Sequence, residues 1–526
     1  MRVGGIGVSS ILLIMAATAA APIIIDAESG QAPNPTDDRL QRADQLFEGK
    51  RYWDALEEYD AAKETTEPDQ LARASRGLLR TLLQVAEFPR AYEEATFLSG
   101  LGTTDPDDRA LYAEALWAFG LFPEAERMYN EVLAVDPGNT LARHGIGRSL
   151  AARGRLEDGV VQLQAAIAGD DRAEYYLTLG AVYRRLQKYD DAIDALEGYL
   201  SRLPRPPRRT IYRRGRRILT NRRAESNVTR SEVRFLRSFG DRMPVQISPE
   251  QLDDIHTIPF RIQNNKVVVR ARVNGNDPMD LVVDTGAEQM VLSRSSAHRV
   301  GVRPIANMLS AGVGRGFRAL ELGRIDTLEI GTLHVSNVPV IINNPTRSDF
   351  PDGHNENSLS PLALGLSTII DYKTHHMIVA RNLPAEVTDI EMPMHFHRLP
   401  MVRGVINGEH PKSFIVDTGG EVISIGFSTA VSLGIVPVRH IPLRVYGTSG
   451  WDPDAFLLPG VNLAFDRVQY DNFPVVVLNL HRPSALLGFH IGGIIGHKFL
   501  HDYRVGFDLA DGVVRLTGAL APSSLR

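Results

Sequence analysis

The chain has 526 residues, of which 43% are hydrophobic, and its formal net charge is -5. The length predicts three or four domains, and the apolar content suffices for folded cores, which excludes a largely disordered chain. The chain has no cysteine, which excludes disulfides, thiolate zinc sites and thiol nucleophiles.

The first residues are typical of an export signal. Arg2 is the one charged residue in the first 25, and an apolar stretch over 11–15 and a small-residue run over 16–21 follow it. This order predicts a signal peptide over 1–21 and a periplasmic or secreted protein. An uncleaved membrane anchor is the alternative, because residues 3–25 are uncharged and long enough to span a bilayer.

Residues 36–203 contain a repeat with a period near 34. One slot holds a large side chain, and a small residue follows three positions later. The slot residues are Tyr52, Phe88, Phe122, Leu156 and Tyr189, and the small ones are Ala55, Ala91, Ala125, Gly159 and Ala192. This alternation predicts two helices in each unit that cross closely at the small residue.

The pattern resembles the tetratricopeptide repeat (TPR), with about five units. The resemblance implies an all-α solenoid whose concave groove accepts a protein or peptide partner. The alternative is a helical spacer without a ligand, because the fold does not name a partner.

An Arg-rich linker is predicted over 204–255. Residues 202–223 hold ten arginines and no acidic residue, and Pro204, Pro206 and Pro207 end the helical pattern. We interpret this stretch as a solvated linker, with contact to an anionic membrane surface or an acidic partner as the alternative. Nucleic acid is not an expected partner, because the stretch has no interleaved aromatic residues and no recognition motif.

The second half contains an internal duplication. Residues 281–288 match residues 414–421, and each segment places Asp-Thr-Gly after an apolar run. Pro278 and Pro411 precede their aspartates by six residues in both copies. Asn-Gly pairs, which favour tight hairpin turns, also recur, at 274–275 and 407–408. The sequence therefore predicts two β-rich lobes, 256–381 and 392–520.

Two further correspondences are expected from spacing. We align residues 362–365 with 493–496, so that Gly365 matches Gly496, and Asp371 with Asp502. In this alignment both glycines follow an apolar run and would pack under the active-site loops as structural glycines.

The duplicated Asp-Thr-Gly, with its apolar flanks and later glycine, resembles the retropepsin-type and pepsin-like aspartic proteases. The resemblance covers about half the chain. It implies a multidomain fold class: an all-α TPR-like solenoid followed by an all-β bilobed aspartic protease. In that family each lobe supplies one catalytic Asp, here Asp284 and Asp417.

Two carboxylates about 3 Å apart cannot both ionise cheaply, so Asp284 and Asp417 would share one proton. The ionised carboxylate takes a proton from a bridging water, and the protonated one donates to the scissile carbonyl. The expected activity is aspartic endopeptidase hydrolysis of a polypeptide substrate, without a cofactor or metal.

Neighbouring residues would support the dyad. The resemblance implies that Thr285 and Thr418 bond to the backbone of the opposite lobe. Gly286 and Gly419 let the backbone approach the carboxylates. Ala287 and Gly420 stand where pepsin-like enzymes carry a hydroxyl, which predicts a mildly acidic optimum.

Glycine-rich hairpins in each lobe are expected to act as flaps. One lies over 309–317 and the other over 445–451. The flap candidates are Gly312, Gly314, Gly316, Gly447, Gly450 and Trp451.

Two alternatives keep the same folds. In one, like lobes of two chains pair as in a homodimeric retropepsin, whereas the duplication favours a pseudo-dimeric monomer. In the other, the protease lobes are inactive and the TPR module is an adaptor or scaffold, against which both copies of Asp-Thr-Gly argue.

Overall fold

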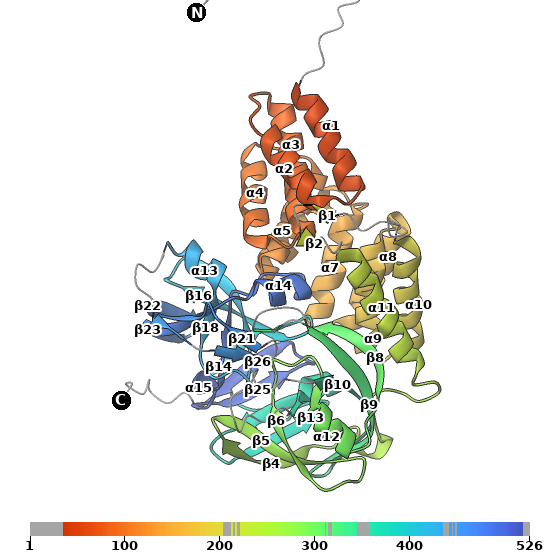
Figure 1. Cartoon of the computed structure of the whole chain (residues 1–526). Helices are drawn as coiled ribbons and strands as arrows, with labels where there is room; N and C mark the ends of the chain where they lie inside the picture. Colours follow the sequence, from red (N-terminus) through yellow and green to blue (C-terminus); the bar gives the residue numbers. More distant parts are fainter. Residues whose placement is uncertain are drawn as a thin grey trace, which may run out of the picture.

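The computed structural model describes residues 35–203, 212–213, 216–217, 221–310, 312–313, 318–343, 357–434, 441–443, 445–447 and 450–518. The signal peptide expected over 1–21 lies outside these residues, as does most of the arginine-rich stretch before 221. Within the described part of the chain, none of the helices combines the length and hydropathy that a bilayer crossing needs. Figure 1 shows a helical array joined to a β-rich body.

Ten helices form the N-terminal region, which confirms the predicted solenoid. They are α1 (Pro35–Glu48), α2 (Tyr52–Ala62), α3 (Pro68–Gln84), α4 (Phe88–Gly100), α5 (Pro106–Ala118), α6 (Phe122–Val135), α7 (Thr140–Ala152), α8 (Leu156–Gly169), α9 (Ala173–Arg185) and α10 (Tyr189–Arg202). The five slot residues of the repeat are the first residues of α2, α4, α6, α8 and α10.

Small residues allow the helices to cross closely. Ala55 and Ala125 are fully buried, and a methyl group added at Gly145 would stand 2.3 Å from the ring of Tyr129. The turn before α7 is also encoded locally, because the side chain of Asn139 accepts the N–H of Ala142 and caps the helix. The repeat period therefore follows from the regular packing of the helices.

The predicted linker contains short strands and a long helix. Strands β1 (Tyr212–Arg213) and β2 (Arg216–Arg217) pair antiparallel, and α11 spans Asn221–Arg237. Helix α11 packs on α10 and on β8 of the first lobe, with an ion pair of 2.5 Å between Arg184 and Glu232. Strand β3 (Gln246–Ile247) and the short helix η1 (Pro249–Gln251) follow.

The described residues of lobe 1 form ten strands. They are β4 (His256–Gln263), β5 (Lys266–Val273), β6 (Met279–Val283), β7 (Met290–Ser293), β8 (Pro304–Ser310), β9 (Arg318–Ile330), β10 (Leu333–Asn343), β11 (Ser358–Leu359), β12 (Ser367–Asp371) and β13 (His376–Ala380). Helix α12 (Arg294–Arg299) and the 3-10 helix η2 (Pro361–Leu364) connect them.

Lobe 2 repeats this plan. Its strands are β14 (Ile390–Pro393), β15 (His395–Phe396), β16 (Pro400–Ile406), β17 (His410–Val416), β18 (Ser424–Gly426), β19 (Ile441–Pro442), β20 (Val445–Gly447), β21 (Gly450–Asp452), β22 (Phe456–Phe465), β23 (Val468–Leu478), β24 (Gly493–Ile495), β25 (Arg504–Asp508) and β26 (Val513–Thr517). Its helices are α13 (Phe427–Ser432), α14 (His481–Leu487) and α15 (His497–Leu500).

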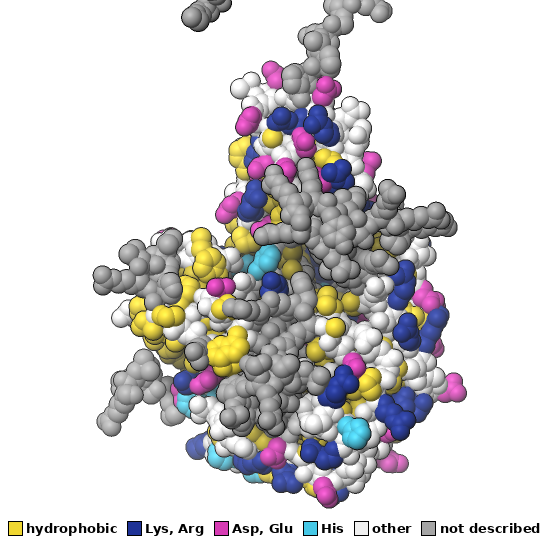
Figure 2. Space-filling view, viewed as in Figure 1, with side chains coloured by type: hydrophobic (Ala, Val, Ile, Leu, Met, Phe, Trp, Pro, Cys, Tyr) yellow, Lys and Arg dark blue, Asp and Glu magenta, His cyan; other side chains and the backbone are white. Residues whose placement is uncertain are grey.

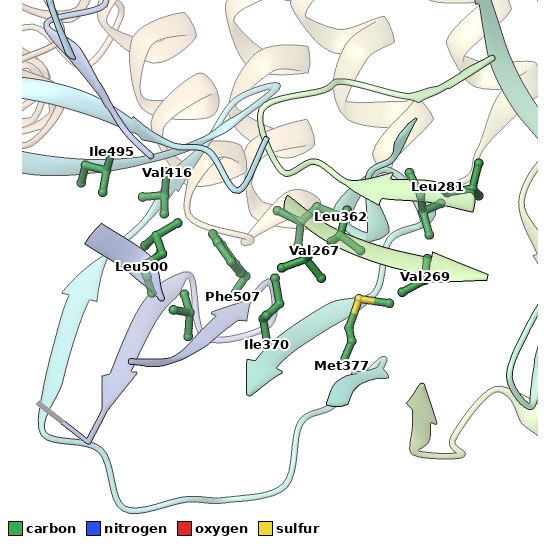
Figure 3. Close-up of a cluster of buried hydrophobic side chains, with 14 of the residues drawn as sticks. Val267, Val269, Leu281, Leu362, Ile370, Met377, Val416, Ile495, Leu500 and Phe507 are labelled. Atoms are coloured by element: carbon green, nitrogen blue, oxygen red, sulfur yellow. The ribbon is translucent and has the colours of Figure 1, made fainter. Parts of the chain in front are cut away.

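The two lobes share one sheet and one core. Strand β12 pairs antiparallel with β25, placing Ile369 opposite Gly506, and the order β14-β26-β25-β12-β13-β4 runs across both lobes. Figure 3 shows side chains of both lobes in the buried cluster beneath this sheet, among them Val267, Ile370 and Phe507. The fold is thus bilobed and mostly β, as the sequence predicts.

Strand pairing corrects the alignment of the two copies. The backbone N–H of Asp284 donates to Leu359 O and that of Asp417 to Ile495 O, both at 2.9 Å. The residue equivalent to Gly496 is therefore Ser360, not Gly365. Gly365 is the exposed, left-handed end of η2 (φ 71°), and no other atom lies within 4 Å of the position a Cβ would take.

The later expected correspondence is also wrong. Asp371 ends β12, and its side chain accepts the N–H groups of residues 373 and 374 and pairs with Arg504. Asp508 ends β25 and does the same with residues 510 and 511 and with Arg515. Asp371 therefore corresponds to Asp508 rather than to Asp502.

The solenoid packs directly on lobe 2. A single buried cluster contains Trp117 and Phe122 of the solenoid together with Met401, Ile415 and Phe489 of lobe 2. Backbone and side-chain bonds cross the same interface, from the N–H of residue 490 to Ala118 O at 2.7 Å and from the hydroxyl of residue 413 to Gly120 O at 2.5 Å. We call this interface the seam.

The rest of the visible surface is mixed in character. Figure 2 shows basic and acidic side chains interspersed over the end of the solenoid, and hydrophobic side chains near α13. Phe427 and Val431 of α13 are half exposed.

Candidate active site

Two loops meet where the lobes face each other. Asp284 follows β6 and Asp417 follows β17, each at the end of an apolar strand buried in the core. Both aspartates remain partly exposed while their strands are buried. Each aspartate lies against the motif glycine of the opposite loop, and the two carboxyl groups interact electrostatically, so the structure brings together the two aspartates that the sequence singles out.

Reciprocal threonine bonds join the loops. The hydroxyl of Thr285 donates to Val416 O at 2.7 Å, and the hydroxyl of Thr418 donates to Val283 O at 2.8 Å. Each hydroxyl also accepts the other threonine's backbone N–H at 3.1 Å. Because both threonines are fully buried, these bonds are shielded from water and fix the relative position of the aspartates.

A side chain at either motif glycine would collide with the aspartate of the opposite lobe. A methyl group added to Gly286 would stand 2.4 Å from Cγ of Asp417, and one added to Gly419 would stand 2.4 Å from Oδ1 of Asp284. Their N–H groups donate to the aspartate of their own loop, at 3.0 Å and 2.8 Å. Each glycine therefore contacts both carboxylates of the pair.

Burial and the neighbouring Asp417 carboxyl raise the pKa of Asp284 well above its ordinary value. Lys266 and the N–H of Gly286 act in the opposite direction, because both stabilise the charged form. A carboxyl pair in this environment holds one proton over a wide pH range. That state provides one base and one acid side by side.

The residues after the motif glycines differ between the loops. Ala287 carries no hydroxyl, and a Cβ at Gly420 would lie 3.0 Å from Oδ2 of Asp417. A side chain at 420 would therefore crowd the dyad. Gly496 lies beneath this loop, since a Cβ there would stand 2.6 Å from the backbone of Val422.

Interlobe cations form a feature that sequence analysis did not identify. Lys266 of lobe 1 donates to Gly419 O of lobe 2. Arg398 of lobe 2 forms an ion pair of 2.6 Å with Glu288 of lobe 1. The sequence contained one indication of the contact made by Glu288, because Glu288 and Glu421 occupy the same position in the two copies, four residues after the aspartate. For Lys266 no sequence signal existed.

The flap hairpins approach each other. Strands β20 and β21 form a hairpin that carries Gly447, Gly450 and Trp451, and the Trp451 ring lies 3.5 Å from that of Tyr446. A Cβ at Gly447 would lie 2.4 Å from Val313 O of the lobe 1 hairpin.

Gly312 is adjacent to this contact in the chain, whereas Gly314 and Gly316 lie outside the described residues. Val313 and Val445 also pack against the cluster at the seam.

The aspartyl protease family matches the chain twice, over residues 269–368 and 402–499. These ranges contain the two aspartates, and each lies within one of the two lobes. The two matches are tandem repeats in the C-terminal part of the chain. None of the curated proteins compared with the chain is a significant match.

Solved TPR proteins match the helical region. A thermophilic TPR protein of Thermus thermophilus is 20% identical, covering 32% of this chain and 92% of that one with a TM-score of 0.29. YrrB, described as a TPR protein with an unusual peptide-binding site, is also 20% identical, covering 31% of this chain and 84% of its own with a TM-score of 0.23.

Proposed function

We propose that this chain, whose C-terminal part carries two aspartyl protease repeats, is an aspartic endopeptidase with Asp284 and Asp417 as its catalytic residues. The observation that carries the proposal is the pairing of these carboxyl groups on loops held by reciprocal threonine bonds. Both aspartates come from one chain, so the proposed enzyme needs no second copy.

In the proposed reaction the dyad holds one proton and one bridging water. The ionised carboxylate removes a proton from the water, whose oxygen attacks the scissile carbonyl carbon, while the protonated carboxyl donates to the carbonyl oxygen. The proton taken from water then passes to the leaving nitrogen as the C–N bond breaks, and one hydroxyl of the tetrahedral intermediate returns its proton to the other carboxylate. One water is consumed, and an amine and a carboxylic acid are formed.

Replacing either aspartate by asparagine is expected to remove proteolysis. A single Asn keeps the shape of the dyad but takes away the shared proton, and the loss should be at least about 100-fold in kcat/KM. The assay is cleavage of an unfolded protein, with and without a pepstatin-like transition-state mimic. Asp471→Asn, at an exposed position in β23, is the matched control and should cleave normally.

The outcomes separate the alternatives. Loss of activity in both variants of a monomer supports the intramolecular dyad, and partial activity in a concentration-dependent dimer supports pairing of like lobes. Failure of the native chain to cleave any unfolded protein between about pH 3 and 8 would favour the inactive adaptor.

The pH profile should peak at mildly acidic pH. The raised pKa of Asp284 and the absence of a hydroxyl at positions 287 and 420 both disfavour a fully charged dyad at low pH. Activity should fall at high pH when the dyad loses its shared proton, and at low pH when it takes up a second. A kcat/KM profile with its maximum below about pH 3 would contradict this expectation.

Recruitment and export are further parts of the proposal. The solenoid would bring a polypeptide to the protease through the surface that stacked helical repeats expose. The apolar segment over 11–15 and the small residues after it would direct export. Cross-linking of a trapped substrate to α1–α4 tests the first statement, and cell fractionation tests the second.

A further inference from the structure

Lys266 brings a positive charge from one lobe to the active-site loop of the other. It is the first residue of β5, directly after a turn in which Asn264 and Asn265 both have left-handed backbones (φ 51° and 55°). Its side chain is half-buried and its ammonium donates to Gly419 O. The tight turn places the start of β5 against the opposite lobe.

Gly419 connects Lys266 to the dyad. The carbonyl of Gly419 accepts from Lys266, and its N–H donates to Oδ1 of Asp417 at 2.8 Å. The α-carbon of the same residue lies close to the carboxyl of Asp284, because a Cβ added to Gly419 would stand 2.4 Å from Oδ1 of Asp284. A displacement of the ammonium would therefore move the residue that touches both carboxylates.

The two interlobe cations differ in whether a carboxylate forms an ion pair with them. Arg398 is neutralised by Glu288 at 2.6 Å, whereas Lys266 forms no ion pair with a carboxylate in the parts of the chain the structure describes. The charged and titratable groups around it are Asp284 after β6, Asp417 after β17 and His497 on α15. His497 is neutral above about pH 4, because burial, His501 and Lys266 lower its pKa to about 4.

We propose that Lys266 is a positioning residue of the dyad: it fixes the Gly419 loop from the opposite lobe and keeps one carboxylate ionised toward lower pH. This inference rests on the proposed function and adds the group that controls its working range. The ammonium takes the place of the hydroxyl that positions 287 and 420 lack, since it too stabilises the charged form of the pair.

The test compares two substitutions at one position. Lys266→Met removes the charge and keeps most of the side-chain length, and it should move the acid limb of the kcat/KM profile by about one pH unit toward higher pH. Lys266→Arg retains the charge and should leave the limb in place. Lys373→Met, in an exposed turn of the same lobe, is the control. A lower rate with an unmoved limb in Lys266→Met would overturn the proposal.

A second readout does not need proteolysis. The folded-state pKa of Asp284 is raised, so the stability it contributes is present below the unfolded pKa of about 3.9 and is lost as pH rises through the folded pKa. Asp284→Asn should therefore increase the Tm at pH 7 and change it little below about pH 4.

Lys266→Met should raise the folded pKa of the dyad further, so the Tm gain from Asp284→Asn, measured at a pH above that folded pKa, should be larger in that background. An unchanged gain would contradict the proposal. If the Tm gain increases in the Lys266→Met background but no protein is cleaved, the charge effect of Lys266 is supported and the proposed protease activity is wrong. If the protein cleaves its substrate but Lys266→Met changes neither the acid limb of the kcat/KM profile nor the Tm gain from Asp284→Asn, the proposed protease activity is supported and the proposed role of Lys266 is wrong.

Discussion

Replacing Gly286 by alanine is expected to reduce kcat/KM at least about 100-fold, because a misplacement of reacting groups by about 1 Å can have that effect. The new methyl group would stand 2.4 Å from Cγ of Asp417, far inside van der Waals contact. Asp417 cannot retreat freely, since its loop is held by the Thr418 bonds to lobe 1. The same substitution at Gly419 would displace Asp284.

The stability change should be smaller than the activity change. Overpacking a close-fitting site costs about 1–3 kcal/mol of unfolding free energy, which a thermal or urea unfolding curve would measure. Gly100→Ala is the matched control, because a Cβ there meets no other atom within 4 Å. Full activity in Gly286→Ala would show that the loops are not locked together.

Replacing Phe122 by alanine is expected to lower the unfolding free energy by about 3–5 kcal/mol. Phe122 is 2% exposed, and its ring centroid lies 4.7 Å from that of Trp117, 5.0 Å from His395 and 5.4 Å from Phe489. The side chain thus joins the solenoid to lobe 2. Its removal leaves a cavity at the seam rather than inside one domain.

Because the seam is shared, the solenoid and lobe 2 should unfold together. Ile415, two residues before Asp417, belongs to the same buried cluster, so loosening the seam should also reduce proteolysis. Trp53→Ala is the control, since Trp53 on α2 is 54% exposed. Separate helical and β transitions, with only the first shifted by Phe122→Ala, would contradict a common core.

Local signals predicted much of this molecule. The residues Tyr52, Phe88 and Phe122 mark helix starts because each repeat places a large side chain at the first position of its second helix. The duplicated Asp-Thr-Gly predicted the two loops because the motif combines a catalytic carboxylate with a hydroxyl and a glycine that the loop itself requires. Both kinds of information are carried within a few residues.

Alignment by spacing failed where the two copies have connections of different length. The segment from Asp284 to Ser360 is three residues shorter than that from Asp417 to Gly496, and the glycine that follows an apolar run at a similar distance in lobe 1 is Gly365, which was therefore selected. The pairing of β11 with β6 and of β24 with β17 identifies the equivalent residues without reference to length.

The sequence by itself determined the class of each part: a helical repeat array, two β-rich lobes and two aspartates on matching loops. These follow from periodicity and from motifs whose residues are neighbours in the chain. Only the tertiary structure decided that Lys266 reaches Gly419, that Arg398 pairs with Glu288 and that Phe122 packs on lobe 2. Such contacts join residues more than one hundred positions apart, and their geometry depends on how the lobes and the solenoid pack, which no local pattern records.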